Sequence, residues 1–190
     1  MSDFENDITA SLRVLHEGGL ILYPTDTVWG IGCDATNEEA VKDVFALKQR
    51  DERKSMVILL ADVRDLLKHI AHPHPDIANI INGFDRPTTV IYDGALGLAP
   101  SAVHEDGSVA IRIVQDEFCR HLIKRFRKPL VSTSANISGE PAPGVFADIS
   151  PVIRRGVNYV VQHRQQDTER KPPSRIIKIH QDGRMDIIRE

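Results

Sequence analysis

The spacing of apolar residues changes along the chain and predicts helices alternating with strands. Residues 4–15 carry apolar side chains three and four apart, which predicts an amphipathic helix ending at Gly18 and Gly19. Residues 108–114 alternate apolar with other side chains, as a strand does. We expect further helices at residues 38–47, 62–69, 76–81, 117–126 and 148–154. We expect further strands at residues 20–23, 56–60, 88–92, 130–131, 159–161, 175–180 and 185–188.

Three connections complete this pattern. Residues 93–107 are rich in Gly and Pro, which predicts a loop with little core of its own. Residues 162–173 are almost free of apolar side chains, and we expect a mobile surface loop that acts as a lid or a severable connection. Asp182 and Gly183 favour a tight turn that pairs the last two strands as a hairpin.

Composition limits the class of protein. A chain of 190 residues with 41% hydrophobic side chains can form one domain over residues 1–190. A net charge of -3 argues against a surface that is wholly a nucleic-acid footprint, so any polyanion site must be local. Cys33 and Cys119 form no metal or disulfide motif, and we expect no protein metal site. The polar N-terminus and the lack of a long apolar run predict a cytoplasmic protein without a membrane segment.

Small polar side chains follow the strand at residues 130–131. Residues 132–136 read Ser-Thr-Ser-Ala-Asn, and Gly139 frees the backbone to turn, which together suit an anion cradle. The same residues could instead cap a turn with their own side chains. A second polar cluster, Thr25 to Thr27, lies past another strand end, where open α/β sheets bind ligands. There, Asp26 could also cap its own turn.

A run of cations follows the helix at residues 38–47. Lys48 and Arg50 can converge on one ligand only if this helix ends near Leu47, while Arg53 and Lys54 extend the run toward the next strand. The alternative is a solvated basic end that offsets the helix dipole. Arg112 lies on the opposite strand face from its apolar neighbours, where it meets either solvent or a ligand.

Together these clusters supply positive charge, small donors and one carboxylate, a set that suits a nucleoside triphosphate. No Ser-His-Asp or Cys-His arrangement is evident. We therefore expect catalysis by positioning and charge stabilisation around a displaced phosphate, without a covalent enzyme intermediate.

At these residues the chain resembles the YrdC-like family, the threonylcarbamoyl-AMP synthases, over nearly its whole length. Four of its ordered motifs are present: Tyr-Pro-Thr-(Asp/Glu)-Thr at residues 23–27, Lys-x-Arg at 48–50, Val-x-Val-Arg at 109–112 and Ser-x-Asn at 134–136. The resemblance implies a mixed, twisted α/β sheet with helices on both faces around a deep cavity. It also implies a reaction of L-threonine, bicarbonate and ATP that yields threonylcarbamoyl-AMP and pyrophosphate for the t6A modification of tRNA.

The resemblance also implies a role for individual residues. Lys48 and Arg50 would stabilise charge in catalysis, and Mg²⁺ would accompany ATP by bridging its phosphates. The chain resembles the short, bacterial-type members of the family, which lack a further C-terminal domain. This resemblance implies that partner proteins receive the product. The ATP-binding residues would be Lys48, Arg50, Ser134, Ala135, Asn136 and Arg189. Threonine or its carbamate would be held by Thr25, Arg112, Thr133 and Ser174.

The chain departs from the family pattern at three places. Asp51 replaces a Pro, residues 84–87 read Phe-Asp-Arg-Pro in place of Trp-Pro-Gly-Pro, and Arg175 replaces a Thr. The last change could disturb the nucleotide site. Two other functions therefore stay open: a double-stranded RNA-binding module, with phosphates along Lys48, Arg50, Arg53 and Lys54, and a catalytically idle nucleotide-binding paralogue.

Overall fold

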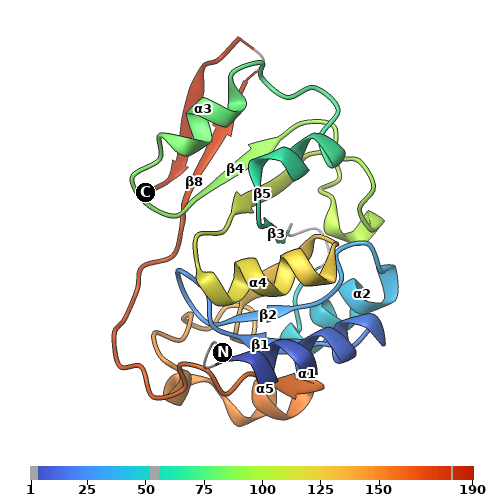
Figure 1. Ribbon diagram of the computed structural model, residues 1–190, viewed down its shortest axis with the longest axis vertical. Helices are drawn as coiled ribbons and strands as arrows, with labels where there is room; N and C mark the ends of the chain where they lie inside the picture. The colour runs from blue at the N-terminus through green and yellow to red at the C-terminus, as the bar shows by residue number, and fades with distance from the viewer. Residues whose placement is uncertain (1–3, 52–55, 181) are drawn as a thin grey trace.

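The protein is built on one mixed β-sheet, shown in Figure 1. The computed structural model describes residues 4–51, 56–180 and 182–190, and within these nine strands follow the order β7-β1-β2-β6-β3-β5-β4-β8-β9. Three neighbouring pairs, β1 with β7, β3 with β5 and β4 with β8, are parallel, and the other pairs are antiparallel. The strands are β1 (Ile21–Tyr23), β2 (Gly30–Gly32), β3 (Val57–Leu60), β4 (Thr88–Tyr92), β5 (Val109–Ile113), β6 (Leu130–Ser134), β7 (Tyr159–Val160), β8 (Arg175–Ile179) and β9 (Met185–Arg189).

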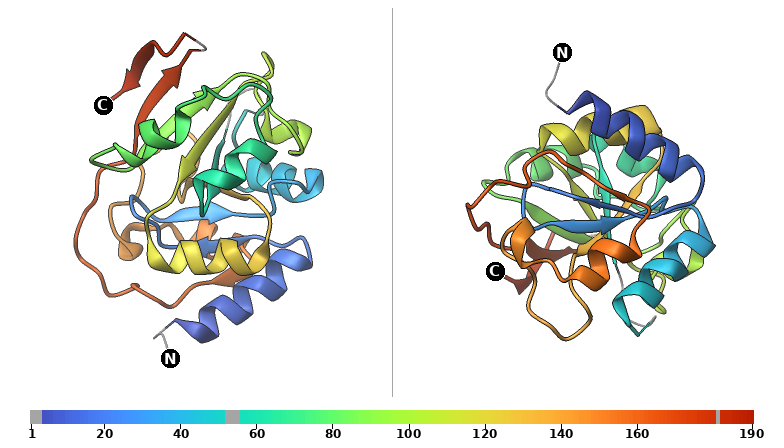
Figure 2. Two further views of the ribbon diagram at one scale, coloured as in Figure 1. Left: turned by 45° about the horizontal axis from the view of Figure 1, so that its top comes forward. Right: turned by 90° about the horizontal axis from the view of Figure 1, so that it is seen from below.

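Helices cover both faces of this sheet, which confirms the predicted fold class. On one face α1 and α4 pack against each other, and their apolar side chains form one core with those of β1 and β3 (Figure 2). On the other face a larger core joins the sheet to α2, α3, α5 and the 3₁₀ segments η1 and η2. The bounds are α1 (Glu5–His16), α2 (Glu38–Lys48), α3 (Ile77–Asn82), α4 (Glu117–Phe126), α5 (Pro151–Gly156), η1 (Val63–Lys68), η2 (Pro100–Ala102) and η3 (Phe146–Asp148).

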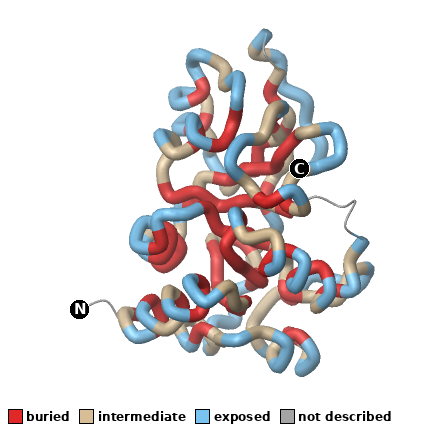
Figure 3. The backbone as a smooth tube through the Cα atoms, turned by 90° about the vertical axis from the view of Figure 1, so that its right-hand side faces the viewer, coloured by how far each residue is buried: buried red, intermediate tan, exposed pale blue. Residues whose placement is uncertain are grey.

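Burial follows these two cores. The central strands are buried, whereas the helices are buried on one side and the last strand, β9, is exposed along its length (Figure 3). In the described parts of the chain, no helix has both the length and the apolar character needed to cross a membrane.

Capping residues fix the helix ends beside the predicted site. The Asn37 side chain accepts hydrogen bonds from two backbone amides, so α2 begins at Glu38 as predicted. Its end lies at Lys48, one residue past the predicted position, because Gln49 adopts a left-handed conformation with φ 50°. Arg50 therefore leaves the helix axis and points away from the direction that a continuing helix would give it.

Two predictions around the central strands are wrong. The sequence predicts no strand between residues 23 and 56, but Gly30–Gly32 form β2, which pairs with both β1 and β6. The signal was hidden because two of its three residues are glycines, which have low strand propensity. The strand expected at residues 130–131 continues as β6 to Ser134, so Ser132 and Thr133 lie in the ladder and the turn begins only afterwards.

Smaller differences concern short helices and one loop. The segment at residues 62–69 is a 3₁₀ helix, and the helix expected at 148–154 begins at Pro151, where proline suits the first turn. Residues 93–107 do contribute to the core, contrary to the prediction, because Ala99 and Ala102 are buried under α2. The sequence does not reveal this packing, because two isolated alanines do not form a run of apolar residues.

The tract at residues 162–173 contains no helix or strand and arcs along one side of the molecule between β7 and β8 (Figure 1 and Figure 2). Its beginning is anchored. The Asp7 carboxylate accepts hydrogen bonds from the backbone amides of Gln162 and His163, and Arg164 donates to the Thr25 carbonyl at 3.1 Å and to Asp116 at 2.8 Å. Its mobility stays a prediction.

Candidate active site

A cavity of about 500 Å³ opens over the middle of the sheet. Side chains of β3, β5 and β6 form its floor, while residues just before β8 and at the end of β9 form one wall. Its volume falls in the range of small-molecule sites. The polar residues that line it include Arg50, Arg112, Thr133, Ser134, Ser174 and Arg189.

These six residues were all predicted from the sequence, and the fold brings them together from distant segments. Strand alternation explains two of them: Arg112 and Ala110 share the face of β5 that borders the cavity, whereas Ile111 lies in the larger core. Arg50 reaches the cavity because α2 ends before it. Arg53 and Lys54, the other cations of that run, lie outside the described residues.

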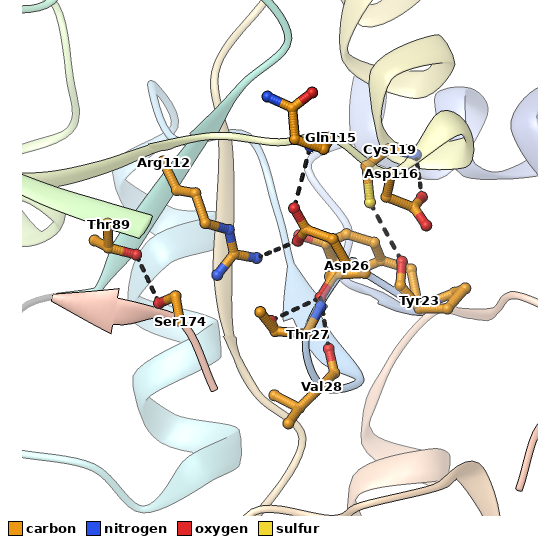
Figure 4. A network of polar contacts seen from close by, with 12 residues as sticks. Tyr23, Asp26, Thr27, Val28, Thr89, Arg112, Gln115, Asp116, Cys119 and Ser174 are labelled. Atoms are coloured by element: carbon orange, nitrogen blue, oxygen red, sulfur yellow. Dashed lines mark hydrogen bonds and ion pairs between the residues drawn. The ribbon is translucent and has the colours of Figure 1, made fainter. Parts of the chain in front are cut away.

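Arg112 is the most buried of the three cavity arginines. Its side chain is 5% exposed, and its Nη2 lies 3.1 Å from Oδ1 of Asp26, whose side chain is 9% exposed. Figure 4 shows the guanidinium reaching from β5 toward Asp26, with Ser174 on its other side. This contact is an ion pair and not a hydrogen bond, so Arg112 Nε and Asp26 Oδ1 have no hydrogen-bond partner within the described structure. A buried guanidinium with an unused donor is suited to an anionic ligand group.

Asp26 does not cap its own turn, the alternative raised from the sequence. Its Oδ2 accepts a hydrogen bond from the backbone amide of Gln115 at 3.1 Å, which ties the turn after β1 to the chain beyond β5. Thr25 closes the turn instead, accepting from Thr27 N at 3.0 Å and donating to the Val28 carbonyl at 2.8 Å. Sequence reasoning counted Asp26 in the polar cluster but missed it as the partner of Arg112, because these residues lie far apart in the chain.

Two further arginines, Arg50 and Arg189, line the cavity and add positive charge. Arg189 donates from Nη2 to the Ser174 carbonyl at 2.7 Å, and the Ser174 hydroxyl hydrogen-bonds that of Thr89 at 2.8 Å. Burial lowers the pKa of Arg50, and burial followed by the charge of Arg112 lowers the pKa of Arg189. Both remain cations at neutral pH because an arginine starts from so high a value. The lining of the cavity is therefore positively charged, which suits an anionic ligand.

Four predicted residues do not line the cavity. Thr25 is used inside its own turn, and Ala135 is buried with its amide donated to the Trp29 carbonyl. Lys48 is 1% exposed, and its ammonium donates to the carbonyls of Ser134 and Asn136. The Asn136 amide group donates to two carbonyls of its own turn, at 3.0 and 2.7 Å. For Asn136 this is the turn-capping role that the sequence left open.

Two of the departures from the family pattern contact each other. Arg175 donates to Asp85 at 3.1 Å and to the Thr88 hydroxyl at 3.4 Å, and its guanidinium lies 5.8 Å from the ring centre of Phe84. Its neighbours Ser174 and Ile176 line the cavity, but Arg175 points to the other face of β8. The substitution therefore lies beside the cavity wall without lining the cavity.

Comparison with known proteins gives a consistent result. A family model named for Sua5, YciO and YrdC, described as "Telomere recombination", matches residues 13–190. The threonylcarbamoyl-AMP synthase of Pseudoalteromonas translucida is 31% identical over 164 residues, covering 85% of this chain and 87% of that protein.

Two solved structures share the fold. P. abyssi Sua5, crystallised with L-threonine, matches with a TM-score of 0.79 and 23% identity over 92% of this chain. The match covers 51% of that protein, so this chain spans about half its length. E. coli YciO matches with a TM-score of 0.82 and 17% identity, covering 97% of this chain and 89% of the other.

Proposed function

Because the chain belongs to the Sua5, YciO and YrdC family, we propose that it is a threonylcarbamoyl-AMP synthase. Relatives that match most of the chain at about 30% identity carry this name. The observation that carries the proposal is the cavity itself, in which three arginines and five small hydroxyl side chains converge. Such a set binds a polyanion together with a small polar molecule.

The proposed reaction joins L-threonine, bicarbonate and ATP into threonylcarbamoyl-AMP, with release of pyrophosphate and water. We assign the ATP phosphates to Arg50, Ser134 and Arg189, which line the cavity from three elements. We assign threonine, or the carbamate it forms, to the region of Arg112 and Thr133. A guanidinium can hold a carboxylate with two parallel hydrogen bonds, which suits Arg112 to an amino-acid substrate.

The chain's own residues would act by position and charge. No His or Cys is found among the described residues that line the cavity, so neither can serve there as a nucleophile. A carbamate oxygen would attack the α-phosphorus of ATP, form the new P–O bond and break the bond to pyrophosphate. Arg50 and Arg189 would stabilise the charge that develops on the departing phosphates.

Mg²⁺ would enter as part of the substrate. In the parts of the chain described, no three His, Cys, Asp or Glu side chains lie close enough to form a metal cage, and the cavity lining holds no carboxylate. This donor set fits an ion held by phosphate oxygens and water, as Mg²⁺ often is in nucleotide enzymes. When bound, it would neutralise part of the triphosphate charge.

We propose that the product serves the t6A modification of tRNA and passes to partner proteins of that pathway. Direct binding of tRNA or double-stranded RNA stays a prediction. A phosphate groove along the cations that follow α2 would not include Lys48, because its ammonium is buried against backbone carbonyls.

The test is pyrophosphate release with each component withheld in turn. We expect release only when ATP, threonine and bicarbonate are all present, because the carbamate is the nucleophile. Valine in place of threonine should be rejected strongly. Serine should be a weaker substrate only by the binding free energy of the missing methyl group, about 1 to 3 kcal/mol. Release without threonine would contradict the proposal. Nucleotide binding with no release in the complete mixture would favour the idle paralogue.

Replacing Arg50 by alanine should weaken ATP binding by about 1.5 to 3 kcal/mol, the usual value of a hydrogen bond to a charged group. Isothermal titration calorimetry measures this directly. The matched control is Arg64→Ala, since Arg64 is exposed and pairs with Asp62 in η1. We expect the control to change ATP affinity by less than about 0.5 kcal/mol. Equal losses in the two variants would place the phosphates elsewhere.

A further inference from the structure

Lys48 is the predicted phosphate ligand that the structure places differently. It ends α2, its side chain is almost fully buried, and it does not line the cavity beside Arg50. Its Nζ donates to the Ser134 carbonyl and, at 2.6 Å, to the Asn136 carbonyl, and it lies 3.5 Å from Asn136 Oδ1. An ammonium has three donors, and here they face the turn after β6.

That turn is tied to the end of α2 in both directions. The Ser138 amide donates to the Lys48 carbonyl at 2.8 Å, while the Lys48 ammonium holds two carbonyls of the turn. Within the turn, the Asn136 side chain donates to the Glu140 carbonyl at 2.7 Å. The backbone of residues 134–140 is therefore built around the lysine before any ligand arrives.

This arrangement has a consequence for an anion in the cavity. Carbonyl oxygens carry partial negative charge and repel phosphate, and two of them belong to the segment that presents Ser134. The ammonium draws both oxygens toward itself and offsets their charge. Burial, followed by the charge of nearby Arg50, lowers the pKa of Lys48 to about 8, so the group remains largely a cation at neutral pH.

We propose that Lys48 is a positioning residue, which holds the backbone of residues 134–136 so that Ser134 faces the nucleotide phosphates, while Arg50 makes the direct contact. The inference rests on the proposed function for the identity of the ligand. It divides the Lys-x-Arg motif into one residue that shapes the turn and one that binds. The Ser-x-Asn motif divides likewise, because Ser134 lines the cavity and Asn136 closes the turn.

The test compares two variants by hydrogen exchange in the ligand-free protein. In Lys48→Met, we expect the Ser138 and Glu140 amides to exchange at least about tenfold faster, because the turn loses charge-assisted hydrogen bonds. ATP affinity should fall by about tenfold or more in the same variant. In Arg50→Ala, ATP affinity should fall while exchange in the turn stays unchanged. Lys42→Met is the control on the same helix, since Lys42 is half exposed, and it should change neither quantity.

Contrary results are clear. If Lys48→Met loses ATP affinity while the turn exchanges as in the wild type, Lys48 is a direct phosphate ligand and the inference is wrong. If that variant does not fold, a structure of the wild-type protein with a non-hydrolysable ATP analogue decides. An ammonium that stays on the Ser134 and Asn136 carbonyls supports the inference, and one that moves to the phosphates overturns it. Failure of the wild-type protein to bind ATP would overturn the proposed function and the nucleotide part of this inference, whatever the exchange rates show.

Discussion

Replacing Arg112 by methionine should lower the free energy of unfolding by about 3 to 5 kcal/mol and abolish turnover. The substitution keeps an unbranched apolar stem but removes the charge, which leaves the Asp26 carboxylate buried without its partner. Breaking a buried ion pair from one side carries a cost of this size, because the remaining charge is not solvated. Chemical denaturation measures the stability, and pyrophosphate release measures the activity.

The double variant Arg112→Met with Asp26→Leu separates the two effects. Apolar side chains of similar volume can replace a buried ion pair at little cost, so most of the lost stability should return. Activity should not return, because the guanidinium that we assign to the substrate is still missing. A stable double variant that regains turnover would show that Arg112 serves only the fold. A single variant that loses less than about 1 kcal/mol would show that Asp26 is well solvated without Arg112.

Replacing Gly32 by alanine should destabilise the protein by about 1 to 3 kcal/mol or more, the usual cost of overpacking. A Cβ on Gly32 would lie 2.6 Å from Cε1 of Tyr23 and 2.8 Å from the Val131 carbonyl oxygen. The second contact is with the backbone of β6, which is paired on both sides by β2 and β3 and cannot move away. The midpoint of thermal unfolding reports the change.

Gly83→Ala provides the matched comparison. Its added Cβ would lie 3.4 Å from the nearest atom, an ordinary contact, and its backbone has a φ of -85° that alanine adopts freely. We expect a change in stability within about 0.5 kcal/mol. If both glycine variants have the same midpoint of thermal unfolding as the wild type, then β2 packs less tightly against β6 than its contacts indicate.

The elements with strong local signals were predictable from the sequence, and β2 was not. The helix α4 has both an apolar stripe and an N-cap at Asp116, and its bounds match the prediction. Strand β2 is defined by its two neighbours, because Gly30 and Gly32 have no side chains to reveal a pattern. Long-range pairing of this kind leaves little trace in a short window.

The residues of the candidate site were likewise predictable only in part. Residue types and motifs were enough to find the arginines of the cavity, but not to decide which polar groups face the ligand. The side chains of Thr25, Lys48 and Asn136 all donate hydrogen bonds to backbone carbonyls. Whether a polar side chain faces the cavity or the backbone depends on the exact conformation of the turn that carries it. The pattern of residues along the sequence does not specify that conformation.

The order of segments around the cavity also bears on how the protein is made. Ser174 and Arg189 belong to the last part of the chain described, and they form the wall that closes the cavity beside β4. A ribosome delivers residues 20–160, and with them most of the sheet, before either of these groups exists. A nascent chain of that length therefore still lacks two of the polar groups that line the cavity. If the chain binds ATP as we propose, the nucleotide becomes a full stabilising ligand only after the final hairpin pairs with β4.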